Sequence, residues 1–292
     1  MAGQLKEVRN RIKSVQNTQQ ITKAMKMVSA AKLRKAQDGI IQMRPYARKL
    51  QEVLSNIVSG GSSVDSNLAV ERPVEKVLLI VITSDRGLCG AYNSNVIKLA
   101  KATISERYSA QAAKGNVKLW TIGKKGFEHF TKNRFDVDAS HKDIFLDLTF
   151  ENVQACSTAA IKAFQAGQFD VVELVYSEFK NAASLTYTVE RFLPIPKIEQ
   201  KEGARNTDFI FEPSKDKLVA ELMPKILNTQ LYKAVLDANA SEHGARMTAM
   251  DKATENANEL LKNLKISYNR ARQAAITTEL TEIVSGAAAL KG

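Results

Sequence analysis

Both ends of the chain carry apolar residues at alternating spacings of three and four, which is the pattern of a coiled-coil helix. Over residues 1–58 the positions in this phase are Leu5, Val8, Ile12, Val15, Leu33, Ala36, Ile40, Met43, Ala47, Leu50, Leu54 and Ile57. In the C-terminal third they are Met247, Met250, Ala257, Leu261, Leu264, Tyr268, Ala271 and Ala275. Long helices need a partner, because isolated helices are marginal in water. Since the two patterns lie at opposite chain ends, we expect an antiparallel pair, with residues 12 and 276 close together.

The seam, meaning the positions expected to face the partner helix, is interrupted in both segments. In the first segment it continues through Gln19, Thr22, Lys26 and Ser29, while Ile21, Met25 and Val28 form a stripe one residue out of phase. In the second segment Thr254 breaks the seam, and from Ile276 to Leu290 the apolar stripe is again out of phase. These phase changes predict a local change of supercoil. Pro45 is expected to kink the first helix rather than end it, and Pro224 and Gly244 are weak points of the second.

Between about residues 76 and 195 the pattern changes to short apolar strands that alternate with helical stretches. The expected strands are Lys76–Thr83, Val117–Ile122, Val171–Ser177 and Ser184–Leu193, and the expected helices lie near Asn93–Tyr108, Gly126–Asn133 and Asn152–Ala166. Every residue from Val77 to Ile82 is apolar, as in a central parallel strand that is covered on both faces. The alternation predicts an open, Rossmann-like α/β sheet.

The predicted fold class is therefore α/β, with a long antiparallel two-helix coiled coil and a central Rossmann-like open α/β domain. The predicted divisions are an N-terminal coiled-coil helix over residues 1–58, a linker over 59–75, the α/β domain over 76–205 and a C-terminal coiled-coil helix over 206–292. The longest apolar run is too short to span a bilayer.

Basic residues are concentrated at the N-terminus. The chain has a formal net charge of +11, and its first 58 residues contain twelve Lys and Arg against three Asp and Glu. A basic helix can bind nucleic acid, because neutralising phosphates needs little more than Lys and Arg. Against this stands the presence of a single aromatic residue, Tyr46, in the segment. A basic coiled-coil scaffold or nucleic-acid-binding protein with an α/β domain remains an alternative function.

No pattern of catalytic or metal-binding residues is visible in the sequence. Cys89 and Cys156 are too few and too far apart for a disulfide framework or a metal site. Acidic residues are scattered, and none forms a recognisable motif with His or Cys. We therefore expect no catalytic residue, no cofactor and no metal.

The segment from Thr83 to Gly90 follows a predicted strand and precedes a predicted helix, where nucleotide-binding α/β proteins hold phosphate. It lacks both GxGxxG and a Lys-Ser/Thr pair, and Asp85 would repel a phosphate. We interpret it as a subunit-contact loop, with a structural turn as the alternative. Arg86 is the expected contact residue, since a guanidinium can make bidentate bonds to a carboxylate.

Three segments resemble the gamma subunits of F-type ATP synthases: ITKAMKMVSAAKLRKAQ over 21–37, TSDRGLCG over 83–90 and RQAAITTELTEIVSGAAAL over 272–290. The resemblance implies a non-catalytic central rotor shaft that couples proton translocation to ATP synthesis or hydrolysis. It implies three alpha and three beta subunits around the coiled coil, and an epsilon subunit and a membrane ring of c subunits against the α/β domain. It also implies a peripheral position on the cytoplasmic face of a bacterial plasma membrane. Residues 197–213 contain no cysteine, so the thiol regulation of plastid members is not expected.

The residue patterns and the resemblance together predict which residues contact other subunits. They are Met25, Lys26, Arg86, Cys89, Arg272, Gln273, Ile283 and Leu290. Lys26 and Arg272 are expected to bond to partner carboxylates, and Ile283 and Leu290 to form an apolar bearing. Both cysteines are expected by default to be buried structural thiols, and accessibility is the alternative for Cys89 because it lies in a loop.

Overall fold

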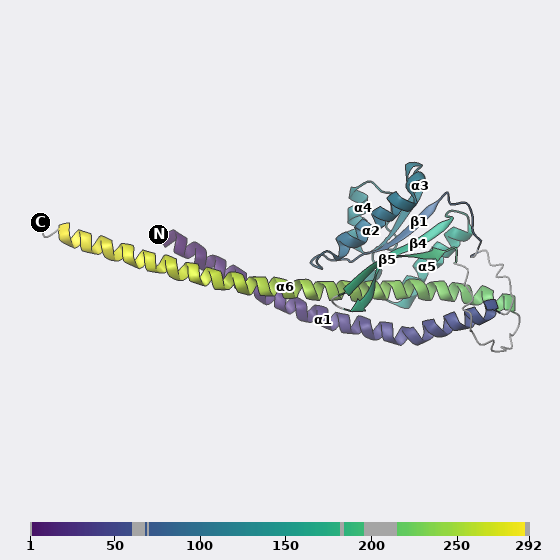
Figure 1. Ribbon diagram of the computed structural model, residues 1–292, viewed down its shortest axis with the longest axis horizontal. Coiled ribbons are helices and arrows are strands. Elements are labelled where there is room, and N and C mark those ends of the chain that lie inside the picture. Colours follow the sequence, from purple (N-terminus) through teal and green to yellow (C-terminus); the bar gives the residue numbers. More distant parts are fainter. Residues whose placement is uncertain (1, 60–67, 69, 182–183, 196–214, 290–292) are drawn as a thin grey trace. The chain divides into compact units, whose positions relative to one another are not determined.

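The computed structural model describes residues 2–59, 68, 70–181, 184–195 and 215–289 (Figure 1). The chain forms two compact units, one of residues 1–29 with 247–292 and one of residues 30–246. Two long helices, α1 (Ala2–Ser59) and α6 (Lys215–Ala289), each contribute residues to both units.

The first unit is an antiparallel pair formed by the start of α1 and the end of α6. The guanidinium of Arg9 donates to the hydroxyl of Tyr268 at 3.0 Å, and the ammonium of Lys26 donates to Asp251 at 2.5 Å. Between these two contacts α1 and α6 advance by equal numbers of residues in opposite directions. One register therefore runs through the unit, and the predicted antiparallel arrangement is confirmed.

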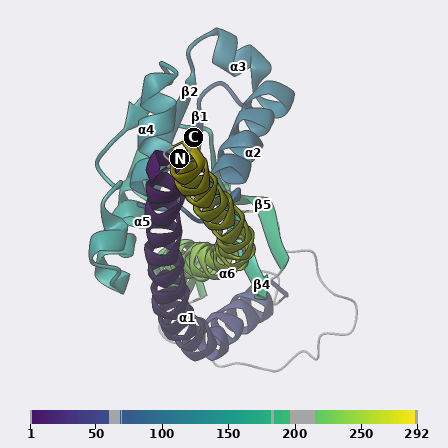
Figure 2. The same ribbon diagram turned by 90° about the vertical axis from the view of Figure 1, so that its left-hand side faces the viewer.

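This register places residues 12 and 276 about three helical turns apart along the pair, so they are near one another but not directly opposite. Residue 12 lies opposite residue 265, and the start of α1 lies opposite residue 275. Consequently α6 continues past the end of its partner, as Figure 1 shows for the yellow end of the helix. Figure 2 shows the same pair from the end at which both termini lie. The apolar pattern alone gave the direction of pairing but not the length of this overhang.

The second unit contains a five-stranded sheet with the order β3-β2-β1-β4-β5. Its strands are β1 (Val77–Ile82), β2 (Val117–Ile122), β3 (Val137–Asp138), β4 (Val171–Asn181) and β5 (Ser184–Leu193). The strands β1 to β4 are parallel, and β5 pairs antiparallel with β4. All six residues of β1 are fully buried, so the predicted central strand is confirmed.

Apolar side chains cover both faces of this sheet, because successive residues of a strand point to opposite sides. Leu78, Ile80 and Ile82 belong to a core that includes α5 (Phe150–Gln165) and residues 223–238 of α6. Val77, Leu79 and Val81 belong to a second core, with α2 (Tyr92–Arg107) and α4 (Lys124–Lys132). The sheet therefore lies between two helical layers, as expected of a Rossmann-like domain.

Most elements match the sequence prediction within a few residues. The elements that were missed are short: α3 (Ser109–Ala113), β3 and a 3-10 turn over Ile144–Leu146. Segments of two to five residues are too short to show a period. The helices α1 and α6 continue through Pro45 and Pro224. Most of the predicted linker and the boundary near residue 205 lie outside the described residues.

Candidate subunit-contact surfaces

The loop over residues 83–90 begins at the carboxyl end of β1, which lies between β2 and β4 at the switch point of the strand order. Proteins with open α/β sheets bind ligands at this point. Here the loop bonds instead to the start of α4 (Lys124–Lys132), the helix that follows β2. The backbone N–H of Lys124 donates to Oδ1 of Asp85 at 3.1 Å, and that of Lys125 donates to the carbonyl of Ser84 at 3.0 Å. The carboxylate of Asp85 thus lies at the N-terminus of α4, where the helix dipole favours negative charge.

Two glycines allow this close approach of β1 and α4. A Cβ at Gly123 would lie 2.3 Å from the carbonyl oxygen of Thr83, and Gly123 has a φ of +99°. The N–H of Gly126 donates to Oγ1 of Thr83 at 2.8 Å, and a Cβ there would lie 2.8 Å from the same oxygen. A side chain at Gly123 is therefore excluded both by space and by backbone conformation.

Cys89 is buried, at 2% exposure, so the default of a buried thiol is confirmed and the alternative of an accessible one is wrong. The Nδ2 group of Asn93, in α2, donates to Sγ of Cys89 at 3.2 Å and to Oγ of Ser84 at 2.8 Å. These bonds turn the thiol towards the core that contains α2. By contrast, Arg86 and Leu88 in the same loop are exposed, Leu88 to 65%.

A residue that the sequence analysis missed holds this loop from α6. The guanidinium of Arg246 donates to the carbonyls of Arg86 at 3.0 Å and Gly87 at 3.2 Å, and to Glu242 at 2.5 Å. Arg246 and Glu242 are both buried. Burial raises the pKa of Glu242, and the neighbouring guanidinium opposes that rise. The spacing of Glu242 and Arg246, four residues apart on a helix, is the signal in the sequence that could have revealed this pair.

His243 lies beside this ion pair. Burial is the main cause that lowers its pKa, and the nearby cations Arg246 and Lys32 lower it further, to about 4. The imidazole is therefore neutral at physiological pH.

Met25 and Lys26 lie in the coiled-coil unit, where α1 carries a partly exposed surface. Met25 is half-buried, and the exposed apolar residues around it include Ile21 and Val28. Lys26 bonds to Asp251 of the same chain, yet 40% of its side chain remains exposed. A groove of about 360 Å³ adjoins this pair, lined by Gln19, Lys23, Lys26, Met27, Asp251, Thr254 and Asn258.

The overhang of α6, residues 276–289, forms the third surface. Its large apolar side chains are between 49% and 68% exposed. They are Ile276, Leu280, Ile283 and Val284. Their spacing places them on one face of the helix. Arg272 and Gln273, just before the overhang, are exposed as well, whereas Leu290 lies outside the described residues.

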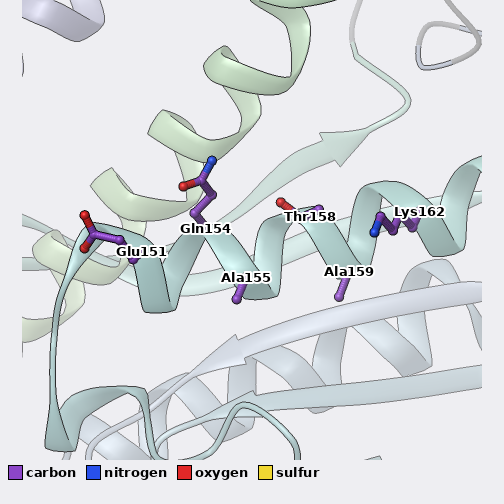
Figure 3. A pocket seen from close by; sticks show the side chains of 6 residues that line it. All are labelled: Glu151, Gln154, Ala155, Thr158, Ala159 and Lys162. Carbon is purple, nitrogen blue, oxygen red and sulfur yellow. The ribbon is translucent and has the colours of Figure 1, made fainter.

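A hollow on α5 does not have the character of a ligand site. It has a volume of about 390 Å³ and is lined by Glu151, Gln154, Ala155, Thr158, Ala159 and Lys162, all on that helix (Figure 3). Side chains from a single helix face do not converge on a ligand as those of binding pockets do. Within the ranges that the structure describes, no group of three His, Cys, Asp or Glu could hold a metal ion. The same ranges contain no helix that is both long and apolar enough to cross a membrane.

Comparison with known proteins identifies the family. A family model described as ATP synthase matches residues 4–290. The ATP synthase gamma chain of Cytophaga hutchinsonii is 52% identical over 98% of both chains, and that of Flavobacterium johnsoniae is 53% identical over 99% of both. This chain belongs to the ATP synthase gamma chain family.

Solved structures share the fold of this gamma-family chain. A chain of the rotor of the Euglena gracilis mitochondrial ATP synthase has a TM-score of 0.64 at 20% identity, covering 94% of this chain and 100% of its own length. A chain of the central stalk and c-ring of the Tetrahymena thermophila mitochondrial enzyme has a TM-score of 0.55 at 25% identity, covering 80% and 99%. Family membership favours a rotor shaft over the nucleic-acid-binding alternative that the basic N-terminal helix raised.

Proposed function

We propose that this gamma chain is the rotating central shaft of an ATP synthase and couples proton translocation to ATP synthesis or hydrolysis. Its coiled coil turns inside a ring of three alpha and three beta subunits. Because the shaft is asymmetric, it contacts the three catalytic sites differently and stabilises different conformations in each. Free energy then passes between the subunits as differences in contact, as in other coupled equilibria.

The observation that carries this proposal is the overhang of α6. Beyond the end of the partner helix, four large apolar side chains lie on one face of α6. Each is about half exposed or more. An exposed apolar stripe of this kind is typical of a surface that another protein covers. The overhang has no charged residue other than Glu279 and Glu282, so it suits an apolar sleeve in which a helix can turn.

We further propose that this chain supplies no catalytic group to the complex. The support is the loop after β1, where Asp85 occupies the N-terminus of α4 and Arg246 occupies the carbonyls of Arg86 and Gly87. A nucleotide phosphate at the N-terminus of α4 would have to displace the bond to Asp85 and approach its carboxylate.

The proposed partners of the α/β domain are the epsilon subunit and the membrane ring of c subunits. Solved relatives of the same fold are described as parts of a rotor and of a central stalk with its c-ring. We place the chain on the cytoplasmic face of a bacterial plasma membrane, as a peripheral subunit of the complex.

The proposed contact residues lie on three elements. They are Met25 and Lys26 on α1, Arg86 in the loop after β1, and Arg272, Gln273, Ile283 and Leu290 towards the end of the chain. Arg272 and Gln273 are assigned to a beta subunit, since exposed side chains of these types can bond to carboxylates and backbone groups. Cys89 is not among them, because its side chain is buried.

The substitution Ile283→Asp tests the bearing. Because Ile283 is 68% exposed, the isolated chain should keep its helix content. In the complex the carboxylate would be buried without a partner, at a cost of several kcal/mol. We expect weaker assembly or weaker coupling, measured as the ratio of ATP-driven proton pumping to ATP hydrolysis. Ile283→Ala should have a smaller effect, and Glu282→Asp is the matched control on the same helical turn. Equal coupling in Ile283→Asp and the unsubstituted chain would contradict a buried overhang.

A further inference from the structure

Three successive positions of the coiled-coil seam carry polar side chains that bond across the pair. Gln19 bonds to Asn258, Thr22 to Thr254 at 2.8 Å, and Lys26 to Asp251 at 2.5 Å. On α6 this polar stretch is flanked by buried apolar seam residues, among them Met250 and Leu261. The sequence analysis found the polar positions on α1, but among those on α6 it found Thr254 alone.

The ion pair of Lys26 and Asp251 is too exposed to contribute much to stability. Its side chains are 40% and 46% exposed, and ion pairs at such positions contribute little to stability. Apolar residues at seam positions would stabilise the two helices more. A role other than stability is therefore indicated for these charges.

The geometry leaves the ammonium of Lys26 able to bind a second acid. An ammonium has three N–H donors, and the structure shows one bond from it, to Oδ1 of Asp251. The adjoining groove is lined by two lysines, Lys23 and Lys26, and by one acid, Asp251. Its charge is thus complementary to a carboxylate on a partner protein.

We propose that Asp251 is a positioning residue, which holds the ammonium of Lys26 so that it contacts a carboxylate of the surrounding ring. Without Asp251, the four-carbon stem of Lys26 samples many rotamers, and the contact with the ring has to order it first. With Asp251, the ammonium is ordered before the ring subunit arrives. This inference rests on the proposed shaft function.

A double-mutant cycle in the complete membrane-reconstituted complex tests the inference. The variants are Lys26→Gln, Asp251→Asn and the two together, and the readout is the rate of ATP synthesis at a fixed proton-motive force. Because ordering one flexible side chain on contact has a measurable cost, each single variant is expected to lose about twofold or more in that rate. If Asp251 acts only through Lys26, the double variant is no slower than Lys26→Gln alone. Losses that multiply, or a full synthesis rate in Asp251→Asn, would overturn the proposal.

A charge exchange separates positioning from simple helix pairing. The variant Lys26→Asp with Asp251→Lys restores the ion pair but moves the ammonium from α1 to α6. We expect the exchanged chain to keep the thermal unfolding midpoint of the unsubstituted chain and to lose its rate of ATP synthesis. Recovery of synthesis would show that the pair serves only to join the helices. The control is Thr22→Val with Thr254→Val, which removes the neighbouring polar contact without touching a charge and should keep the synthesis rate. Failure of this inference leaves the bearing test of Ile283 unaffected.

Discussion

At the scale of single residues, the end of β1 is bonded to the first turn of α4 by side chains of its own loop. Asp85 bonds to the first N–H of α4, and Gly126 bonds to Thr83. Each bond satisfies a backbone donor in the first turn of α4, so these donors are not free to bind a phosphate. The sequence indicated the outcome through Asp85, although it did not reveal the partner helix.

Gly123 is the residue at which a single methyl group should be most damaging. In Gly123→Ala the new Cβ meets the carbonyl of Thr83, and the backbone at φ +99° is strained as well. We expect the free energy of unfolding, measured in urea, to fall by about 3 kcal/mol or more. Gly115→Ala is the matched control, because its φ is +74° and its Cβ would meet no atom within 4 Å. The control should lose about 1–2 kcal/mol from backbone strain alone. Equal losses in the two variants would show that the close approach is unimportant.

His243 should make the stability depend on pH below neutrality. Its pKa in the folded chain is about 4, below its ordinary value of 6.5, so the folded chain binds fewer protons than the unfolded chain between these values. The stability that the neutral imidazole confers is complete above pH 6.5 and is lost as the pH falls towards 4. His243→Gln should therefore lose less unfolding free energy than the unsubstituted chain between pH 7 and 4.5. The pKa values of His129 and His141 are also lowered, but this effect is the same in the His243→Gln variant and in the unsubstituted chain, so it cancels in the comparison. Parallel pH profiles would contradict the burial of His243.

At the scale of elements, α6 serves the sheet as well as the coiled coil. Its residues 223–238 pack on one face of the sheet. In addition, Arg246 donates hydrogen bonds to two backbone carbonyls of the loop after β1. Fixing an exposed loop from a rigid helix limits the conformations of Arg86, the proposed contact residue, before any partner binds.

Arg246→Met tests this role of α6. Removing the guanidinium leaves Glu242 buried without its partner, and breaking such a pair typically costs 3–5 kcal/mol. We expect a lower unfolding temperature together with faster hydrogen exchange at the amides of residues 86–89. In the double variant Glu242→Gln with Arg246→Met, stability should largely return while the fast exchange remains, because the loop still lacks its donor. Slow exchange in both variants would mean that other contacts hold the loop.

The sequence predicted long elements well and contacts between them poorly. The strand β1 is apolar at every position, and the helical seams extend over many turns, so both have strong periodic signals. The short β3 has none. Cys89 packs in a core with residues of several elements, and the loop contacts of Arg246 link residues about 160 positions apart, so neither could be inferred from local patterns. The overhang of α6 required the register, which individual cross-helix bonds fix.

At the scale of the whole molecule, membership of the gamma chain family and the exposed end of α6 support the same account. The chain combines a basic pair of helices with an α/β domain whose loop after β1 is bonded to the chain's own groups. These features suit a subunit that transmits force and leaves the chemistry to its neighbours. The central claim of this account is that the chain rotates within the ring. A covalent tie between shaft and ring is therefore its most direct test.

Leu88 is suited to this tie because it is exposed in the loop after β1, unlike Cys89. The variant Leu88→Cys, with Cys89→Ser, would be assembled with a beta subunit that carries a facing cysteine, with Cα atoms roughly 4.4–6.8 Å apart. The measurement is steady-state ATP hydrolysis before oxidation, after oxidation and after reduction. The account predicts that turnover collapses on oxidation and returns on reduction, while nucleotide binding at a single catalytic site survives. Full turnover in a complex shown to be quantitatively cross-linked would contradict a rotating shaft.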